Sequence, residues 1–114
     1  MKRLLFFYPL FLLFLISSCG KLVSDKNPDF IGTWTSTDFT NNYILVIESD
    51  NSAAFYRLNM SNDTITTNLG TAKINSNDML IIGNLKLKIS EYPNFDSQNG
   101  VWVCTLENWP FVRQ

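Results

Sequence analysis

The amino-acid sequence predicts an all-β domain, a small antiparallel meander closed as a barrel or a flattened sandwich, behind an apolar N-terminal segment. Short runs of β-branched and aromatic residues recur between residues 30 and 113. Clusters of Asn, Asp, Ser and Gly separate these runs at nearly regular intervals. No long stretch of Ala, Leu, Glu and Lys occurs, and we therefore expect few helices in the folded part.

The first half of the expected meander holds four strands. Residues 30–36 form the first, and residues 43–49 form the second around the β-branched, apolar run Tyr-Ile-Leu-Val-Ile. The turn sequences Asp-Asn-Ser and Ser-Asn-Asp flank the third strand, at residues 53–60. A polar, Thr-rich strand over residues 64–69 follows, and its composition suits the edge of a sheet.

The second half of the meander contains the clearest period-two pattern of the chain. Leu85, Leu87 and Ile89 alternate with polar residues, which gives this strand one apolar face. Gly83-Asn84, directly before it, is a two-residue hairpin signal. We expect strands at residues 70–75, 79–82, 85–90, 100–106 and 111–113, and a longer loop at residues 93–99.

The first eighteen residues have the pattern of a secretory signal peptide. Lys2 and Arg3 precede an almost unbroken apolar run over residues 4–16, which we expect to be helical. Thirteen residues are too few to cross a bilayer core of about 30 Å as a helix. They suit the apolar core of a cleaved signal, and an uncleaved membrane anchor is the alternative.

The segment Ile16-Ser17-Ser18-Cys19 resembles the lipobox of bacterial lipoproteins. The resemblance implies cleavage between Ser18 and Cys19, with Ile16, Ser17 and Ser18 recognised by the processing machinery. It also implies that diacylglycerol on the Cys19 sulfur anchors the protein to a membrane. Each buried methylene contributes roughly 0.8 kcal/mol, so two or three acyl chains hold a protein on a membrane almost permanently.

The lipobox resemblance also predicts a place for the protein. Gly20 follows Cys19, where some Gram-negative lipoproteins that stay in the inner membrane have Asp. No acidic run follows Cys19, although some Bacteroidetes lipoproteins use such a run for surface export. We therefore expect an outer-membrane lipoprotein that faces the periplasm, with the cell surface as the alternative.

Three parts follow from these patterns. Residues 1–18 are the signal peptide, residues 19–29 are a polar, lipidated tether, and residues 30–114 are the β domain. Loss of two cations with the signal leaves seven basic against ten acidic side chains, a net charge of −3. No basic patch remains, and nucleic acid is therefore not an expected partner.

The residue types exclude most enzyme chemistry. The chain has no histidine, which rules out Ser-His-Asp and Cys-His catalysis and every His-ligated metal site. Because Cys19 carries the anchor, Cys104 has no partner for an internal disulfide. Cys104 lies between Trp102 and Leu106 on one strand face, which favours a buried, inert thiol over a reactive one. We expect a non-catalytic protein without cofactor or metal.

The start of the β domain carries a second resemblance. Ile31-Gly32-Thr33-Trp34 resembles the Gly-x-Trp opening of lipocalins and lipocalin-like domains. Residues 70–74 and 79–82, with Trp102 and the final Arg113, are similar to small lipocalin-like lipoproteins of Bacteroidetes. The resemblance implies a barrel that binds a hydrophobic small molecule. It also implies that Arg113 packs across Trp34 at one end of the barrel, a contact that contributes about 0.5–2 kcal/mol. A terminal Arg113 that frays into solvent is the alternative.

Two weaker patterns concern the surface. Aromatic residues in predicted loops and bends form a candidate binding surface, because exposed aromatics mark contact sites. These residues are Phe39, Tyr92, Phe95 and Trp109. Asp63-Thr64-Ile65 resembles the O-glycosylation pattern of exported Bacteroidetes proteins, with Thr64 as the acceptor.

The sequence thus predicts a lipid-anchored envelope protein that binds a hydrophobic small molecule or another envelope protein. A small protein inhibitor or immunity protein is one alternative, and a structural envelope module is another. The shape of the barrel distinguishes the first two functions. An internal apolar cavity of a few hundred Å³ indicates a small ligand, whereas a filled barrel with one protruding loop at residues 93–99 indicates a protein target.

Overall fold

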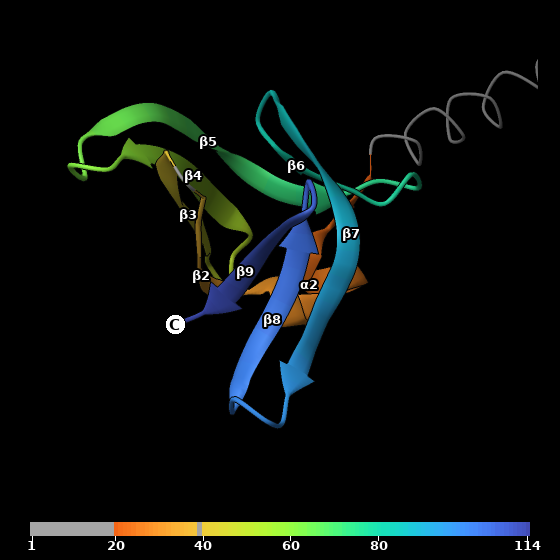
Figure 1. Ribbon diagram of the computed structural model, residues 1–114. Helices are drawn as coiled ribbons and strands as arrows, with labels where there is room; N and C mark the ends of the chain where they lie inside the picture. The colour runs from red at the N-terminus through yellow and green to blue at the C-terminus, as the bar shows by residue number, and fades with distance from the viewer. Residues whose placement is uncertain (1–19, 39) are drawn as a thin grey trace, which may run out of the picture.

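The computed structural model describes residues 20–38 and 40–114, and these form a closed, eight-stranded antiparallel barrel (Figure 1). The signal peptide, the lipobox with Cys19, and Phe39 lie outside the described residues. The barrel strands are β2 (Gly32–Thr37), β3 (Asn41–Ile47), β4 (Ser52–Asn59), β5 (Thr64–Ile74), β6 (Met79–Ile82), β7 (Leu85–Asp96), β8 (Val101–Leu106) and β9 (Trp109–Arg113).

The barrel is an up-and-down meander. Each strand pairs with the next one along the chain, and β9 returns to pair with β2 through Trp34 with Arg113 and Thr35 with Val112. The predicted all-β meander is confirmed, and the architecture is lipocalin-like. The predicted hairpin at Gly83-Asn84 joins β6 to β7, as expected.

The two ends of the barrel differ, and we name them by what lies there. The closed end carries the turns at residues 48–51, 75–78 and 97–100 together with the N-terminal segment. The open end carries the turns at residues 60–63, 83–84 and 107–108 and the connection between β2 and β3. In Figure 1 the closed end lies below, where β7 turns into β8 and where the short helix α2 (Val23–Lys26) is seen.

The expected tether is wrong from Lys21 onward. This segment forms β1 (Lys21–Leu22), α2 (Val23–Lys26) and the 3-10 helix η1 (Pro28–Phe30), and β1 pairs with the last residues of β5. Val23 and Phe30 are fully buried against the core. The side chain of Asn51 bonds both the backbone N–H and the hydroxyl of Ser24, each at 2.8 Å. The segment therefore closes one end of the barrel, because its two apolar side chains bury there.

Two strand predictions are also wrong. The expected strands at residues 64–69 and 70–75 are the single strand β5, which changes partner from β4 to β1 near Ala72. The expected loop at residues 93–99 is half strand, because β7 continues to Asp96. Register shifts between Ile89 and Asn94 accommodate Pro93, whose missing N–H costs no regular ladder bond there.

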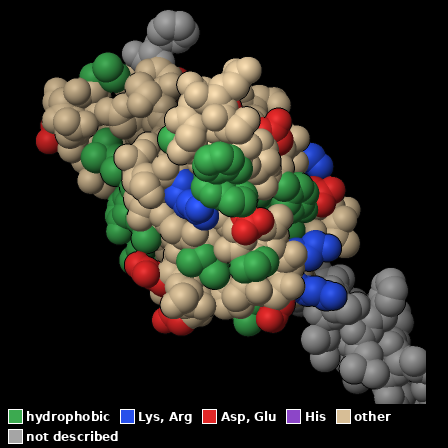
Figure 2. Space-filling model, turned by 90° about the horizontal axis from the view of Figure 1, so that it is seen from below, with side chains coloured by type: hydrophobic (Ala, Val, Ile, Leu, Met, Phe, Trp, Pro, Cys, Tyr) green, Lys and Arg blue, Asp and Glu red, His purple; other side chains and the backbone are tan. Residues whose placement is uncertain are grey.

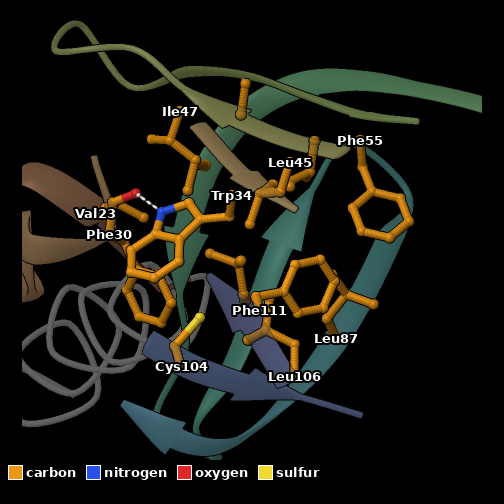
Figure 3. Packing of buried hydrophobic residues seen from close by; sticks show 14 of the residues in the cluster. Val23, Phe30, Trp34, Leu45, Ile47, Phe55, Leu87, Cys104, Leu106 and Phe111 are labelled. Atoms are coloured by element: carbon orange, nitrogen blue, oxygen red, sulfur yellow. Dashed lines mark hydrogen bonds between the residues drawn. The ribbon is translucent and has the colours of Figure 1, made fainter. Parts of the chain in front are cut away.

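The core fills the barrel from the closed end to its middle. Figure 3 shows the side chains that pack there, with Trp34 at the centre. Phe111 and Leu45 are fully buried beside it, and Phe55 lies at the margin with 5 % exposure. Apolar area buried in this way contributes about 25 cal/mol per Å².

Candidate functional site

The closed end is sealed around Trp34 and Arg113. The Arg113 guanidinium carbon lies 5.7 Å from the ring centroid of Trp34 and 4.8 Å from that of Trp102. Trp34 is fully buried. The predicted contact is confirmed, and a frayed Arg113 is excluded, because the side chain is held between two indole rings.

Hydrogen bonds and one glycine fix this arrangement. The Trp34 indole N–H donates to the carbonyl of Phe30 at 2.8 Å, as the dashed line in Figure 3 shows. Arg113 donates to the carbonyl of Asp29 at 3.3 Å. A Cβ atom at Gly32, where φ is +140°, would lie 2.8 Å from Cδ of Arg113. The Gly-x-Trp sequence therefore leaves the space that Arg113 occupies.

The surface at the closed end is continuous. Figure 2 looks onto this end, where apolar side chains lie between acidic and basic ones and no opening into the barrel is visible. The described core residues beneath this surface include Phe30, Trp34 and Phe111 at 0 % exposure. A ligand must therefore approach the barrel from elsewhere.

Cys104 is buried in β8 at 1 % exposure, as predicted. Burial raises the pKa of the thiol to about 12, and the charge of Glu91 adds to the shift. Because the thiolate is the reactive species, Cys104 in the folded protein is a core side chain and an unreactive one.

A cup of about 300 Å³ lies inside the open end of the barrel. Five strands contribute to its wall. The lining residues are Tyr43, Phe55, Arg57, Thr66, Asn68, Leu85, Leu87 and Trp109. They are inward-facing residues of the upper barrel, and the cup ends where the filled core begins.

The register of the sheet orders one side of the cup into two rows. In the outer row Arg57 is paired with Tyr43 on one side and with Thr66 on the other. In the inner row Phe55 is paired with Leu45 and with Asn68. Directly paired residues of neighbouring strands share one face, so a polar rim lies above a mainly apolar floor.

Aromatic contacts join this side of the cup to Trp109 and Phe111 on β9. The ring of Trp109 in β9 stacks on Tyr43 in β3, with centroids 4.6 Å apart and planes 14° from parallel. Phe55 contacts Tyr43 at a centroid distance of 6.0 Å and Phe111 at 6.4 Å. Offset aromatic pairs of this kind add about 0.5–1.5 kcal/mol to area burial, which holds the wall in place.

A second hollow of about 380 Å³ adjoins the cup between the upper parts of β2 and β9. Ser36, Thr37, Asp38, Trp109 and Pro110 line it. The two strands pair at only two positions, both nearer the closed end. Pro110 carries no N–H for further pairing. Trp109 lines both hollows and separates them.

Asp38 holds the Tyr43 side of the wall. Its carboxylate accepts hydrogen bonds from the backbone N–H of Thr40 and Asn41, and from the hydroxyl of Tyr43 at 2.9 Å. The Thr40 bond, followed by the Asn41 bond, lowers the pKa of Asp38. Burial, followed by the bond to Asp38, raises the pKa of Tyr43. Tyr43 is therefore neutral at physiological pH, and its ring is fixed before any ligand binds.

The expected aromatic surface does not exist as one patch. Trp109 lines the cup at the open end, whereas Tyr92 and Phe95 lie toward the closed end. Tyr92 packs on Phe30 and donates its hydroxyl to Asp78 at 2.5 Å. Phe95 is 53 % exposed and contacts Trp102 edge-on. The prediction is wrong as a surface because these residues stand at opposite ends of their strands.

The remaining predicted site residues have simple positions. Thr64 is exposed at the first position of β5, directly after the turn that contains Asp63, and its glycosylation stays a prediction. In the part of the chain that the structure describes, His, Cys, Asp and Glu side chains form no group of three that could hold a metal. Among the same residues, no helix is long and apolar enough to span a membrane.

Comparison with known protein families, with curated proteins and with solved structures finds no match to this chain. A functional proposal for this chain therefore rests on its sequence and on the geometry of the barrel.

Proposed function

We propose that this chain is a lipid-anchored, non-catalytic protein of the bacterial envelope, and that its barrel binds a small hydrophobic molecule in the open-end cup. The observation that carries the proposal is the cup itself, a hollow of about 300 Å³ with a mainly apolar wall from five strands. Ligand pockets commonly measure about 300–1,000 Å³, combine an apolar wall with a few polar groups, and are largely preformed.

The size of the cup limits the ligand. Phe55 and Phe111 occupy the barrel directly beneath it, and the core below them is packed. A volume at the lower end of the usual range suits a small molecule or one end of a longer one. The proposal therefore does not include a complete phospholipid inside the barrel.

The proposed anchor fits the position of the N-terminus. Gly20, to which Cys19 is bonded, packs beside Ile74 and Asn75 at the closed end. Acyl chains on Cys19 would hold this end toward a membrane and leave the open end free. We place the protein in the outer membrane, facing the periplasm, with the cell surface as the alternative.

Two substitutions on neighbouring residues of β5 test the binding site. Thr66 lines the cup, whereas Thr67 lies on the outer face of the same strand. We expect Thr66→Trp to fill the cup and to weaken binding of the neutral probe N-phenyl-naphthylamine at least tenfold, and Thr67→Trp to leave binding unchanged. The full chain is tested in nanodiscs, with empty nanodiscs as the blank. Equal probe binding by both variants would contradict the proposed site.

The anchor has an equally direct test. Labelled palmitate fed to a bacterial host should enter the wild-type chain and the Cys104→Ala variant, because the buried Cys104 is not the acceptor. Cys19→Ala should carry no label. Label retained on that variant would remove lipidation at Cys19 from the proposal.

A small protein inhibitor is the second candidate, and one observation favours it. Three large apolar side chains are exposed on the hairpin of β4 and β5: Met60 at 61 %, Ile65 at 48 % and Leu69 at 66 %. Figure 1 shows this hairpin projecting from the barrel. Under this alternative, Met60→Ser and Ile65→Ser would abolish capture of the target protein and leave probe binding in the cup intact. The loop expected for this role, at residues 93–99, is a short turn after β7 instead.

A further inference from the structure

We infer that the cup selects an anionic amphiphile, whose apolar body lies on the cup wall and whose single anionic head is bound by Arg57. This inference rests on the proposed function, because it names the ligand class of the same cup. It starts from the placement of one charged side chain on the inner wall.

Arg57 belongs to the inward-facing set of β4. Ala53 and Phe55 precede it at period two, and both are buried at 8 % and 5 % exposure. Arg57 continues this face beyond the packed core, and its side chain is exposed where it lines the cup. A cation on an inner wall is unusual for a barrel interior, where apolar residues pack best.

The charge of Arg57 is not balanced within the cup. Of the eight described residues that line it, Arg57 is the charged one, and the others are apolar or neutral. Asp38 lies in the adjoining hollow, and its carboxylate is bonded to the turn after β2 and to Tyr43. The cup therefore offers a positive site to a ligand and no negative one.

Neutral polar groups stand beside the cation. Thr66 is the register partner of Arg57 on β5, and Asn68 lies one inward position deeper on the same strand. A carboxylate, sulfate or phosphate head could accept two hydrogen bonds from the guanidinium and one from the Thr66 hydroxyl. Charge-assisted bonds of this kind are about twice as strong as neutral ones.

The apolar body would lie on the opposite wall. Leu85, Leu87 and Trp109 line that side, and Leu87 is 4 % exposed. Figure 3 shows Phe55 above the ring of Phe111 and Leu87 beside it. The cup thus has a polar, positive rim on β4 and β5 and an apolar wall on β7 and β9, which matches a molecule with two chemically different ends.

The edge of β5 beside the cup is only partly covered. Residues 64–71 pair with β4 on one side, whereas β6 pairs only with Ala72, Lys73 and Ile74. Among residues 20–38 and 40–114, no strand pairs with the other edge of residues 64–71, and the turn at Gly83 packs against Leu69 and Gly70. Side chains of β5 and β7 therefore meet across the cup without β6 between them.

The test compares two ligands that differ in the head alone. Decanoate and decanol have the same alkyl chain, and the full chain in nanodiscs is titrated with each by calorimetry against empty nanodiscs. Because a hydrogen bond to a charged group contributes about 1.5–3 kcal/mol, we expect decanoate to bind roughly 10- to 100-fold more tightly than decanol.

Two substitutions assign the preference to Arg57. Arg57→Met keeps most of the length of the side chain and removes the charge, and it should lower the affinity for decanoate to that for decanol. Lys86→Met is the matched control, because Lys86 lies between Leu85 and Leu87 in sequence but is exposed on the outer face. The Lys86→Met variant should bind decanoate and decanol with the affinities of the wild-type protein.

The outcomes separate this inference from the proposed function. Equal affinities for decanoate and decanol in the wild-type protein, a result that needs no variant, would overturn the anionic-head inference and leave the hydrophobic cup standing. An unchanged preference in Arg57→Met would overturn the role of Arg57. Failure of N-phenyl-naphthylamine and of both decyl ligands to bind would overturn the cup as a ligand site, and the inference with it.

Discussion

The two ends of this barrel use aromatic residues in opposite ways. At the closed end Trp34 is fully buried, bonded to the carbonyl of Phe30 and covered by Arg113. At the open end Trp109 stacks on Tyr43 but stays partly exposed, and both rings border a hollow. Trp34 fills the interior of the barrel, whereas Trp109 and Tyr43 surround a hollow. Both arrangements occur in one barrel whose strands have only four to twelve residues.

This difference teaches how a short barrel can be stable and still contain a hollow. A small domain buries a limited share of its surface, so an empty interior along its whole length would leave too little core. Here packed side chains occupy the lower half, and the N-terminal segment adds Val23 and Phe30 to them. The stability supplied there permits a hollow at the other end.

Replacement of the two tryptophans by alanine is the sharpest test of this contrast. We expect Trp34→Ala to lower the free energy of unfolding by about 3–5 kcal/mol, because it removes a fully buried ring and leaves a cavity. Trp109→Ala should cost only about 1–2 kcal/mol, because that ring is partly exposed, and it should weaken ligand binding. Urea unfolding gives both values. Equal losses would mean that the two ends do not differ as described.

Val23 tests whether the N-terminal segment is part of the fold. Val23→Ala should cost about 2 kcal/mol, because it removes two buried carbons and opens a small cavity at the closed end. Val46→Ala, on the outer face of β3, is the control and should cost less than 1 kcal/mol. A loss for Val23→Ala no larger than that of the control would restore the expected free tether.

Two glycines with positive φ separate backbone strain from crowding. Gly32→Ala places a Cβ 2.8 Å from Cδ of Arg113, whereas Gly100→Ala meets nothing within 4 Å. The left-handed conformation of Gly100 costs roughly 1–2 kcal/mol for a residue with a side chain, and the φ of Gly32 lies further from the allowed regions and costs more. We expect Gly32→Ala to cost more than Gly100→Ala, in part from backbone strain and in part from the contact with Arg113, and Arg113→Ala to reduce this difference. Thermal unfolding of the single and double variants measures it, and a difference of the same size without Arg113 would contradict the packing argument.

The smallest expected effect concerns pH at the open end. Because hydrogen bonds lower the pKa of Asp38 in the folded state, they stabilise the fold above its ordinary pKa, near 4. This stabilisation is lost as the pH falls through the lowered value. Asp38→Asn should therefore lower the melting temperature at pH 7 slightly and reduce its fall below about pH 4. Parallel pH profiles of the variant and the wild type would argue against this role of Asp38.

Local patterns predicted the parts of the fold that local forces determine. Turn residues on both sides located β6, and alternation of apolar and polar residues located the start of β7, whereas the contact of Trp34 with Arg113 was implied by the resemblance to lipocalins. The N-terminal segment was missed because its polar residues look like a linker. Its two buried side chains, Val23 and Phe30, pack against residues that are far away in the sequence. No local sequence pattern could therefore predict their burial.

The cup was missed for a similar reason. Its lining residues come from five strands. The spacing of residues within one strand does not show that the five strands face one hollow. Arg57 alternates with Tyr56 and Leu58, which are more apolar, and it therefore reads as a solvated residue on an outer face. In the structure Phe55 packs into the core, and Arg57 therefore lies on the inner face as well.

Under the proposed function, the packed N-terminal segment would determine how the cup exchanges its ligand. With β1 beginning at Lys21, a lipid on Cys19 would leave a single residue, Gly20, between the acyl chains and the folded barrel. A six-residue strand such as β2 rises roughly 20 Å, so the mouth of the cup would stand about that far above the headgroups. At that height ligand would be loaded and released through water, at rates governed by solubility rather than by lateral diffusion in the bilayer.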